Sequence, residues 1–354
     1  MENRQQTLFK IAEDLKLSKT TVSVCLSGNA EKGRVKPETV ERVKKHAEKI
    51  NYIPNRIARS LTKPGKSPVG LIIRQDSSSE KSLYAMRKAM QMLDENGREF
   101  IVQNFLSNHI SDAVAALKGM NVREIIMFGI FSEQVNVERI PQNVLMRFQA
   151  DQARLAALLQ DVKFYAVDYD FPVLENCSLK IYRLGINRDD IYAKLFTALF
   201  KAVNAPIACD ENCISAETRN ALAGLGFEIK PTHIIVMPDN PVENLFKIGH
   251  NLVQKVIAMI KADQIKTVVL HNDKIAAGLI DGLLANGYSV PGDISVIGFD
   301  NIDASPYFKV PLTTIELPVM ENTVTVVDAI LKGMEIPRVI ESDAQILWRD
   351  SAKL

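Results

Sequence analysis

The spacing of apolar residues changes at Val69, and this change constrains the fold more than any other feature of the sequence. Before Val69 the apolar positions recur at helical spacing, whereas after it short apolar runs alternate with amphipathic segments. The first series of runs, which we expect to form buried strands, comprises residues 69–73, 100–102, 125–128 and 164–167. The second series comprises residues 179–182, 207–209, 234–236, 268–270 and 296–299. Strands that alternate with helices predict parallel sheets covered by helices on both faces, here arranged in two lobes.

Length and composition narrow the class of protein. The chain has 354 residues, of which 47% are hydrophobic and 24% are charged, so it can bury more than one core. No run approaches the roughly 20 apolar residues that span a bilayer, and the first residues do not resemble a secretion signal. Four cysteines are too few for a disulfide scaffold in a chain of this length. We therefore expect a cytoplasmic protein.

The charges are unevenly distributed along the chain. Residues 1–66 contain 15 Lys or Arg and 7 Asp or Glu, a net charge of +8, whereas the remaining 28 basic and 35 acidic residues give −7. A basic module on an acidic body indicates a polyanionic partner for the module alone. From charge alone, a solvated basic surface explains the pattern equally well.

The basic segment predicts three short helices. Thr7 is a candidate N-cap of a first helix that runs to about Asp14, and Ser18 is a candidate N-cap of a second helix that Gly28 ends. Pro37 is a good first-turn residue for a third helix, whose apolar positions face the same small core. Two short helices joined by a tight turn are typical of the helix-turn-helix unit that binds DNA.

A further short segment, residues 56–61, follows Asn55 and precedes the helix breakers Pro64, Gly65 and Pro68. A helix of this length is not stable alone, because isolated helices below about 12 residues are marginal in water. We expect a partner chain or a ligand to order it.

This order of elements resembles the lactose-repressor (LacI/GalR) family of bacterial transcription regulators, and the resemblance covers nearly the whole chain. It rests on the segments 7–12, 18–23, 51–61, 272–278, 290–301 and 311–315. It implies a small all-α helix-turn-helix headpiece and an α/β two-lobed body similar to periplasmic binding proteins. The implied divisions are a headpiece at 1–54, a hinge helix and linker at 55–66, and an effector-binding and dimerisation body at 67–354. The implied lobes are about 67–171 with 319–345, and about 172–318 with 346–354.

The resemblance also implies which residues contact DNA. Lys19 and Thr20 lie where the second helix meets base edges in the major groove, and nearby hydroxyls suit phosphate oxygens. Val24 replaces an arginine common in the family, so the operator should differ from the usual one. Residues 56–61 correspond to the hinge helix that enters the minor groove, with Leu61 as an apolar wedge. The implied DNA-binding residues are Thr7, Ser18, Lys19, Thr20, Thr21, Ser23, Val24, Tyr52, Asn55, Arg56, Ala58 and Leu61.

For a small-molecule effector, the resemblance points to side chains that follow strands at the mouth of a cleft between the lobes. These residues are Asp168, Asn272, Asp273 and Asp300. Carboxylates and amides there suit a ligand with many hydroxyls, such as a sugar, although the same residues equally suit helix and turn caps. The position of the family's effector arginine falls on Ile214 or Ser215. A cleft that binds no small molecule therefore stays open as an alternative.

Motifs for catalysis are missing from the sequence. It contains no phosphate loop, zinc-protease motif or nucleophile elbow, and Cys209 and Cys213 have poor spacing for zinc. We expect no enzyme, cofactor or metal. The sequence predicts a homodimeric, sequence-specific DNA-binding regulator, most simply a repressor on a pseudo-palindromic operator. The alternatives are a regulator without an effector and a sugar-binding protein whose headpiece is incidental.

Overall fold

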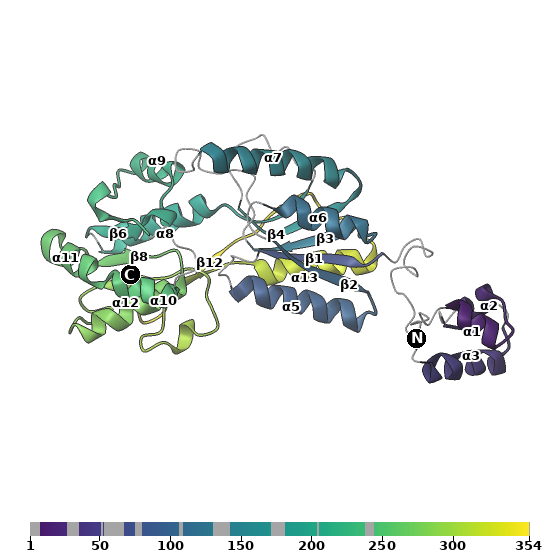
Figure 1. Ribbon diagram of the computed structural model, residues 1–354. Coiled ribbons are helices and arrows are strands. Elements are labelled where there is room, and N and C mark those ends of the chain that lie inside the picture. Colours follow the sequence, from purple (N-terminus) through teal and green to yellow (C-terminus); the bar gives the residue numbers. More distant parts are fainter. Residues whose placement is uncertain are drawn as a thin grey trace. The chain divides into compact units, whose positions relative to one another are not determined.

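The computed structural model describes residues 8–26, 35–50, 52, 67–74, 80–105, 109–129, 142–170, 181–203, 205–237 and 244–353. The chain divides into two compact units, Met1–Pro68 and Val69–Leu354. We call the first unit the headpiece and the second the body (Figure 1). Among the described residues, no helix has the length and apolar character needed to cross a membrane.

The headpiece contains the three predicted helices, α1 (Leu8–Asp14), α2 (Lys19–Leu26) and α3 (Pro37–Lys49). Each helix contributes to one small core, in which Ile11, Val22, Cys25 and Val43 are fully buried. Lys16, with φ of 54°, makes the turn between α1 and α2. The short turn and shared core explain why helices this short are stable together.

The first lobe of the body is built on a six-stranded sheet whose paired strands run parallel. In order across the sheet, its strands are β11 (Val339–Glu341), β5 (Tyr182–Ile186), β4 (Lys163–Asp170), β3 (Glu124–Phe128), β1 (Val69–Arg74) and β2 (Phe100–Phe105). Four helices cover it, namely α5 (Glu80–Glu95), α6 (Ile110–Gly119), α7 (Gln142–Leu158) and α13 (Val319–Lys332). Leu71 packs on the side of α5 and α13, whereas Ile72 packs on the side of α6 and α7, so the sheet is buried on both faces (Figure 1).

The second lobe contains a four-stranded parallel sheet. Its order is β7 (Ile234–Ile235), β6 (Ile207–Asp210), β8 (Thr267–Val269) and β9 (Ser295–Ile297). Its helices are α8 (Arg188–Val203), α9 (Ala216–Gly224), α10 (Leu245–Asn251), α11 (Val253–Asp263) and α12 (Asp273–Ala285). Val268 packs in one core with α10–α12, and Val269 packs in another with α8 and α9. This arrangement confirms the predicted fold class.

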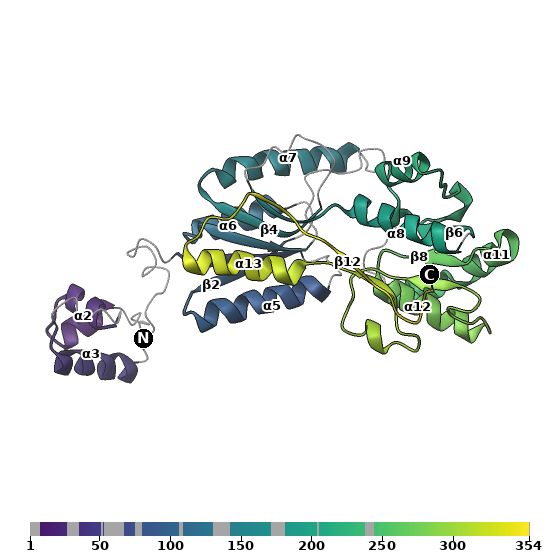
Figure 2. The ribbon, with the colours of Figure 1, turned by 180° about the vertical axis from the view of Figure 1, so that it is seen from behind.

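The remaining elements are short. An antiparallel ribbon pairs β10 (Thr314–Glu316) with β12 (Gln345–Leu347). Single 3₁₀ turns occur at Leu159–Asp161, Glu211–Cys213, Pro231–His233 and Ser305–Tyr307. The chain passes between the lobes at residues 186–188, 316–319 and 341–345, which Figure 2 shows from behind.

One predicted assignment is wrong. The sequence placed a strand near residues 179–182 at the start of the second lobe, but β5 lies in the first sheet, between β4 and β11. Its pairing with β4 determines this position, because Tyr182 lies opposite Tyr165 and their rings stack with centroids 4.6 Å apart. Gly185 allows a close approach to β4, since a Cβ atom there would lie 1.8 Å from the carbonyl oxygen of Tyr169. The first lobe therefore extends at least to Ile186.

Candidate functional site

Helix α2 has two chemically distinct faces. Val22 and Cys25 are fully buried against α1 and α3, and Lys19, Thr20 and Ser23 are exposed. The buried and exposed positions alternate at helical spacing, so the polar side chains point away from the headpiece core. The second helix of a helix-turn-helix unit uses such an exposed polar face to contact base edges in the major groove.

The start of α2 is fixed by its own hydroxyl groups. Ser18 Oγ accepts a hydrogen bond from the N–H of Thr21 at 3.0 Å, and the two hydroxyl oxygens lie 2.8 Å apart. Ser18 is therefore the N-cap that the sequence predicted. The cap holds the free N–H groups of the first turn at the exposed end of the helix, where phosphate oxygens bind favourably.

Other predicted DNA-binding residues fall in different surroundings. Val24 is half-buried on α2, and Tyr52 packs beside the headpiece core with its N–H bonded to the Ala47 carbonyl at 2.8 Å. The predicted residues that lie outside the described part of the chain are Thr7, Asn55, Arg56, Ala58 and Leu61. The hinge helix is thus still a prediction.

In the body, Asp168 and Arg188 form an ion pair where the lobes meet. Asp168 lies in β4 of the first lobe, and Arg188 is the first residue of α8 in the second, with Nη2 of the arginine 3.0 Å from Oδ1 of the aspartate. The arginine carbon Cζ also lies 5.7 Å from the ring centre of Phe299. Burial raises the pKa of Asp168, and the positive charge of Arg188 opposes that rise. The pair therefore connects the two lobes.

This pair leaves part of its hydrogen-bonding capacity unused. Oδ2 of Asp168 and Nη1 of Arg188 are both buried, and neither has a partner among the described residues. A buried donor or acceptor without a partner costs about 1–3 kcal/mol. The junction therefore offers one donor and one acceptor to a polar ligand. The sequence missed Arg188, because Asn187-Arg188-Asp189-Asp190 indicates only the start of a helix.

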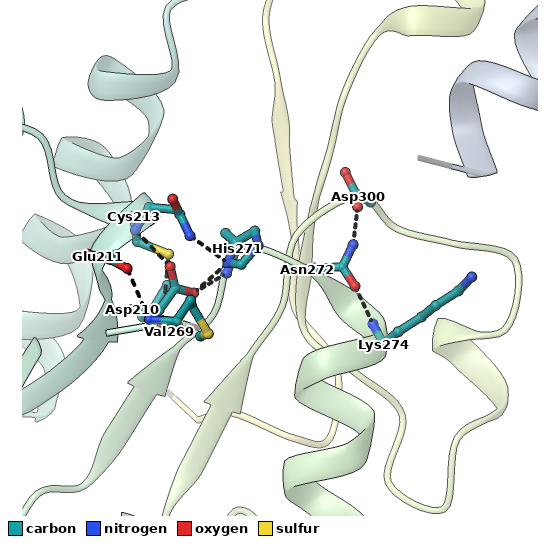
Figure 3. Close-up of polar contacts among 10 residues, drawn as sticks. Asp210, Glu211, Cys213, Val269, His271, Asn272, Lys274 and Asp300 are labelled. Carbon is teal, nitrogen blue, oxygen red and sulfur yellow. Dashed lines mark hydrogen bonds and ion pairs between the residues drawn. The ribbon is translucent and has the colours of Figure 1, made fainter. Parts of the chain in front are cut away.

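Asn272 and Asp300 lie together on the second lobe, as Figure 3 shows. Nδ2 of Asn272 donates to Oδ2 of Asp300 at 2.8 Å, while Oδ1 of Asn272 caps α12 by accepting from the N–H of Lys274. Burial raises the pKa of Asp300 to about 8, and the negative charge of Asp273 adds to this effect. At neutral pH the carboxyl group of Asp300 is therefore mostly protonated and can donate a hydrogen bond.

Asp273 has a structural role instead. Its carboxylate is fully buried and accepts hydrogen bonds from Ser305 Oγ and Thr314 Oγ1, each at 2.5 Å, and from the N–H of Ile302 at 3.0 Å. These bonds attach α12 to the segment that follows β9 and to β10. With both oxygens engaged inside the lobe, this side chain has no free oxygen for an effector.

His271 precedes Asn272 and is held by a buried carboxylate. Asp210, at the end of β6, accepts from the backbone N–H of His271 at 2.7 Å, and its Oδ2 lies 2.9 Å from Nδ1 of the ring (Figure 3). Burial alone would lower the pKa of His271, but the hydrogen bond to Asp210 and the negative charges of Asp210, Asp300 and Glu211 together outweigh it, so the net shift is upward. The imidazole is thus fixed at the carboxyl end of the second sheet.

The described cysteines have the properties of core residues. Cys25, Cys209 and Cys213 are buried and free, and burial raises the pKa of each thiol. Within the described ranges, no group of three or more His, Cys, Asp or Glu side chains is placed to hold a metal ion.

A helical headpiece with an exposed polar recognition helix, carried on a body of two parallel-sheet lobes, defines the class of two-lobed DNA-binding regulators. Residues 7–55 match the family described as "Bacterial regulatory proteins, lacI family", and residues 218–351 match the "Periplasmic binding protein-like domain". The headpiece therefore contains a DNA-binding domain of the lacI family, and the body contains a periplasmic binding protein-like domain. The protein is a DNA-binding transcription regulator and not an enzyme.

Similar proteins align with most of the chain. The HTH-type transcriptional repressor PurR of Histophilus somni is 26% identical over 322 residues, covering 87% of this chain and 86% of that protein. The HTH-type transcriptional regulator AscG of Escherichia coli is 25% identical over 319 residues, an alignment that covers 89% of this chain and 88% of that protein. The lac repressor dimer bound to operator and the anti-inducer ONPF has the same fold, with a TM-score of 0.71, 18% identity and 98% of both chains covered. A LacI-family regulator from Silicibacter pomeroyi gives a TM-score of 0.72 at 20% identity, covering 98% of each chain.

Proposed function

We propose that the protein is a homodimeric repressor that binds a pseudo-palindromic operator, and that a small polar ligand at the lobe junction changes its operator affinity. The observation that carries the proposal is the exposed face of α2, where Lys19, Thr20 and Ser23 stand opposite a buried apolar face. Two similar proteins support the proposal. One relative, PurR, is named a transcriptional repressor, and the similar lac repressor structure is a dimer bound to its operator. A regulator of this kind works in the cytoplasm.

The headpiece residues divide into base readers and positioning residues. Lys19 and Thr20 are the proposed readers, since a lysine at the start of α2 can reach the O6 and N7 acceptors of guanine. Ser23 and the capped first turn of α2 suit phosphate contacts, which fix the register without reading sequence. Val24 offers only apolar contact, for example to the methyl group of thymine.

The proposed effector site is the junction around Asp168, Arg188, Asn272 and Asp300. A ligand with adjacent hydroxyl groups, such as a sugar, would satisfy the unpartnered atoms of the Asp168–Arg188 pair and accept from protonated Asp300. Such a ligand acts only if it binds the DNA-competent and incompetent arrangements of the body with different affinities.

A regulator without a small-molecule effector is the second candidate. The observation that favours it is the pairing of the proposed ligand-binding side chains with each other, Asp168 with Arg188 and Asn272 with Asp300. Thermal unfolding across a panel of neutral sugars, sugar phosphates and nucleobases separates the two candidates, because a ligand at 100 times its Kd stabilises the folded state by about 2.7 kcal/mol. A uniform absence of stabilisation favours the second candidate.

Selection of bound sequences from a random DNA pool tests the DNA-binding part. We expect a pseudo-palindrome, bound about a thousandfold or more tightly than scrambled DNA. Lys19→Ala should change the base preference at one position of each half-site, whereas Leu61→Ala should weaken operator binding with little effect on non-specific affinity. Equal losses on every sequence for both variants would contradict the proposed roles.

A further inference from the structure

The headpiece carries an exposed aromatic side chain beside its recognition helix. Phe9, in the first turn of α1, is 60% exposed, whereas Ile11 and Ala12 on the same helix are buried in the headpiece core. A single exposed apolar side chain needs no special explanation by itself. Its neighbour is informative, because Nζ of Lys19 lies over the Phe9 ring, 2.9 Å from the ring centre.

The ring restrains a side chain that would otherwise be free. Lysine has a flexible four-carbon stem and a compact charge, so an unrestrained ammonium group samples many positions. Within the described part of the chain, Lys19 forms no ion pair with a carboxylate. The face of an aromatic ring attracts a cation through its quadrupole, and the Phe9 ring is thus the group that fixes the Lys19 ammonium at the start of α2.

We propose that Phe9 is a positioning residue for DNA recognition, whose ring holds the ammonium group of Lys19 toward one base pair of the major groove. This inference rests on the proposed role of Lys19 as a base reader. Without the ring, the ammonium can turn toward phosphate oxygens, which also attract it but carry no sequence information. Loss of the ring should therefore lower discrimination between bases more than it lowers affinity.

The experiment uses the full-length protein and the operator selected by the wild type. Lys19→Met first identifies the base pair whose preference depends on the lysine. Phe9→Leu should then reduce discrimination at that base pair about two- to fivefold, and Phe9→Tyr, which keeps the ring, should retain it. The affinity for scrambled DNA should not fall, because the released Lys19 ammonium can still bind phosphate oxygens.

A double-mutant cycle and a matched control make the test specific. In the Lys19→Met background, Phe9→Leu should cause no further loss, since the ring acts through the lysine. Leu225→Ala removes a similarly exposed apolar side chain from the body, at 57% exposure, and should leave discrimination unchanged.

Three results would overturn the inference while leaving the proposed function in place. The first is an equal fall in affinity on all sequences for Phe9→Leu. The second is unchanged discrimination between bases in Phe9→Leu. The third is an effect of Phe9→Leu on discrimination that is as large in the Lys19→Met background as in the wild type. If the wild type selects no operator, the proposed function and the inference fail together. Far-UV circular dichroism of Phe9→Leu confirms that the headpiece is folded in each comparison.

Discussion

The protonation of Asp300 makes the stability of the body depend on pH in a defined direction. Asp300 follows β9, is 9% exposed and has a positive φ of 109°. Its pKa is about 8 in the folded protein, mainly through burial, against an ordinary value of 3.8. Between these two values the folded state holds a proton that the unfolded state has lost. Rising pH therefore favours unfolding across this window.

The size of the effect follows from the same linkage. Each pH unit within the window costs about 1.4 kcal/mol of stability, so the step from about pH 5 to about pH 7 removes about 3 kcal/mol through this one group. Asp300→Asn removes the titration but keeps an oxygen that can accept the 2.8 Å hydrogen bond from Asn272. The free energy of unfolding of the variant, relative to wild type, should thus rise by about 3 kcal/mol over that step.

Urea denaturation at a series of pH values measures this difference. Trp348 is the only tryptophan of the chain and lies just after β12, so its fluorescence reports unfolding of the body. Asp303→Asn is the matched control, because Asp303 is an exposed carboxylate in the same segment as Asp300. Parallel pH profiles for Asp300→Asn and wild type would show that Asp300 is ionised in the folded protein, which would refute the reasoning from burial.

Three other substitutions test the packing and charge arguments by urea denaturation. Gly249→Ala would place a Cβ atom 2.0 Å from a backbone carbonyl oxygen of α12, so we expect the free energy of unfolding to fall by about 2 kcal/mol or more. Gly224→Ala is the control and should not change the free energy of unfolding, because no atom lies within 4 Å of the added Cβ. Arg188→Met should cost about 3–5 kcal/mol, because it leaves a buried carboxylate unpaired, and adding Asp168→Asn should recover part of that loss. Asp273→Ala should cost about 3 kcal/mol or more, since three donors lose their acceptor; a cost near zero would contradict its structural role.

The sequence predicted most where the structure depends on local signals. The headpiece helices begin at Ser18 and Pro37 for reasons contained in a few neighbouring residues, namely a hydroxyl cap and a residue suited to the first turn. The strands of the body were recognisable as apolar runs for the same reason. Membership of a sheet is different, because β5 joins the first lobe through its pairing with β4, and no local pattern specifies a partner strand.

The junction shows the same limit for functional residues. Asp168, Asn272 and Asp300 were predicted because each follows or ends a strand, yet the arginine that pairs with Asp168 comes from the start of α8, which no nearby motif indicates. Asp273 was predicted for the same reason as its neighbours but faces into the lobe, where it bonds to residues about 30 to 40 positions away. Polar type and position after a strand therefore select candidates, and only tertiary contacts show that one of them, Asp273, is engaged inside the lobe.

If the junction binds a ligand as proposed, the proton on Asp300 also makes that binding depend on pH. A ligand that accepts a hydrogen bond from the protonated carboxyl group stabilises that form, so its binding takes up protons and weakens as pH rises through about 8. A ligand that donates to the carboxylate has the opposite dependence and releases a proton. Because Asp300 belongs to one lobe and Asp168 to the other, with Arg188 beside both, either ligand changes the electrostatic balance between the lobes. The sign of the pH dependence thus identifies which hydrogen-bonding form of Asp300 a ligand uses, before the ligand's own position is known.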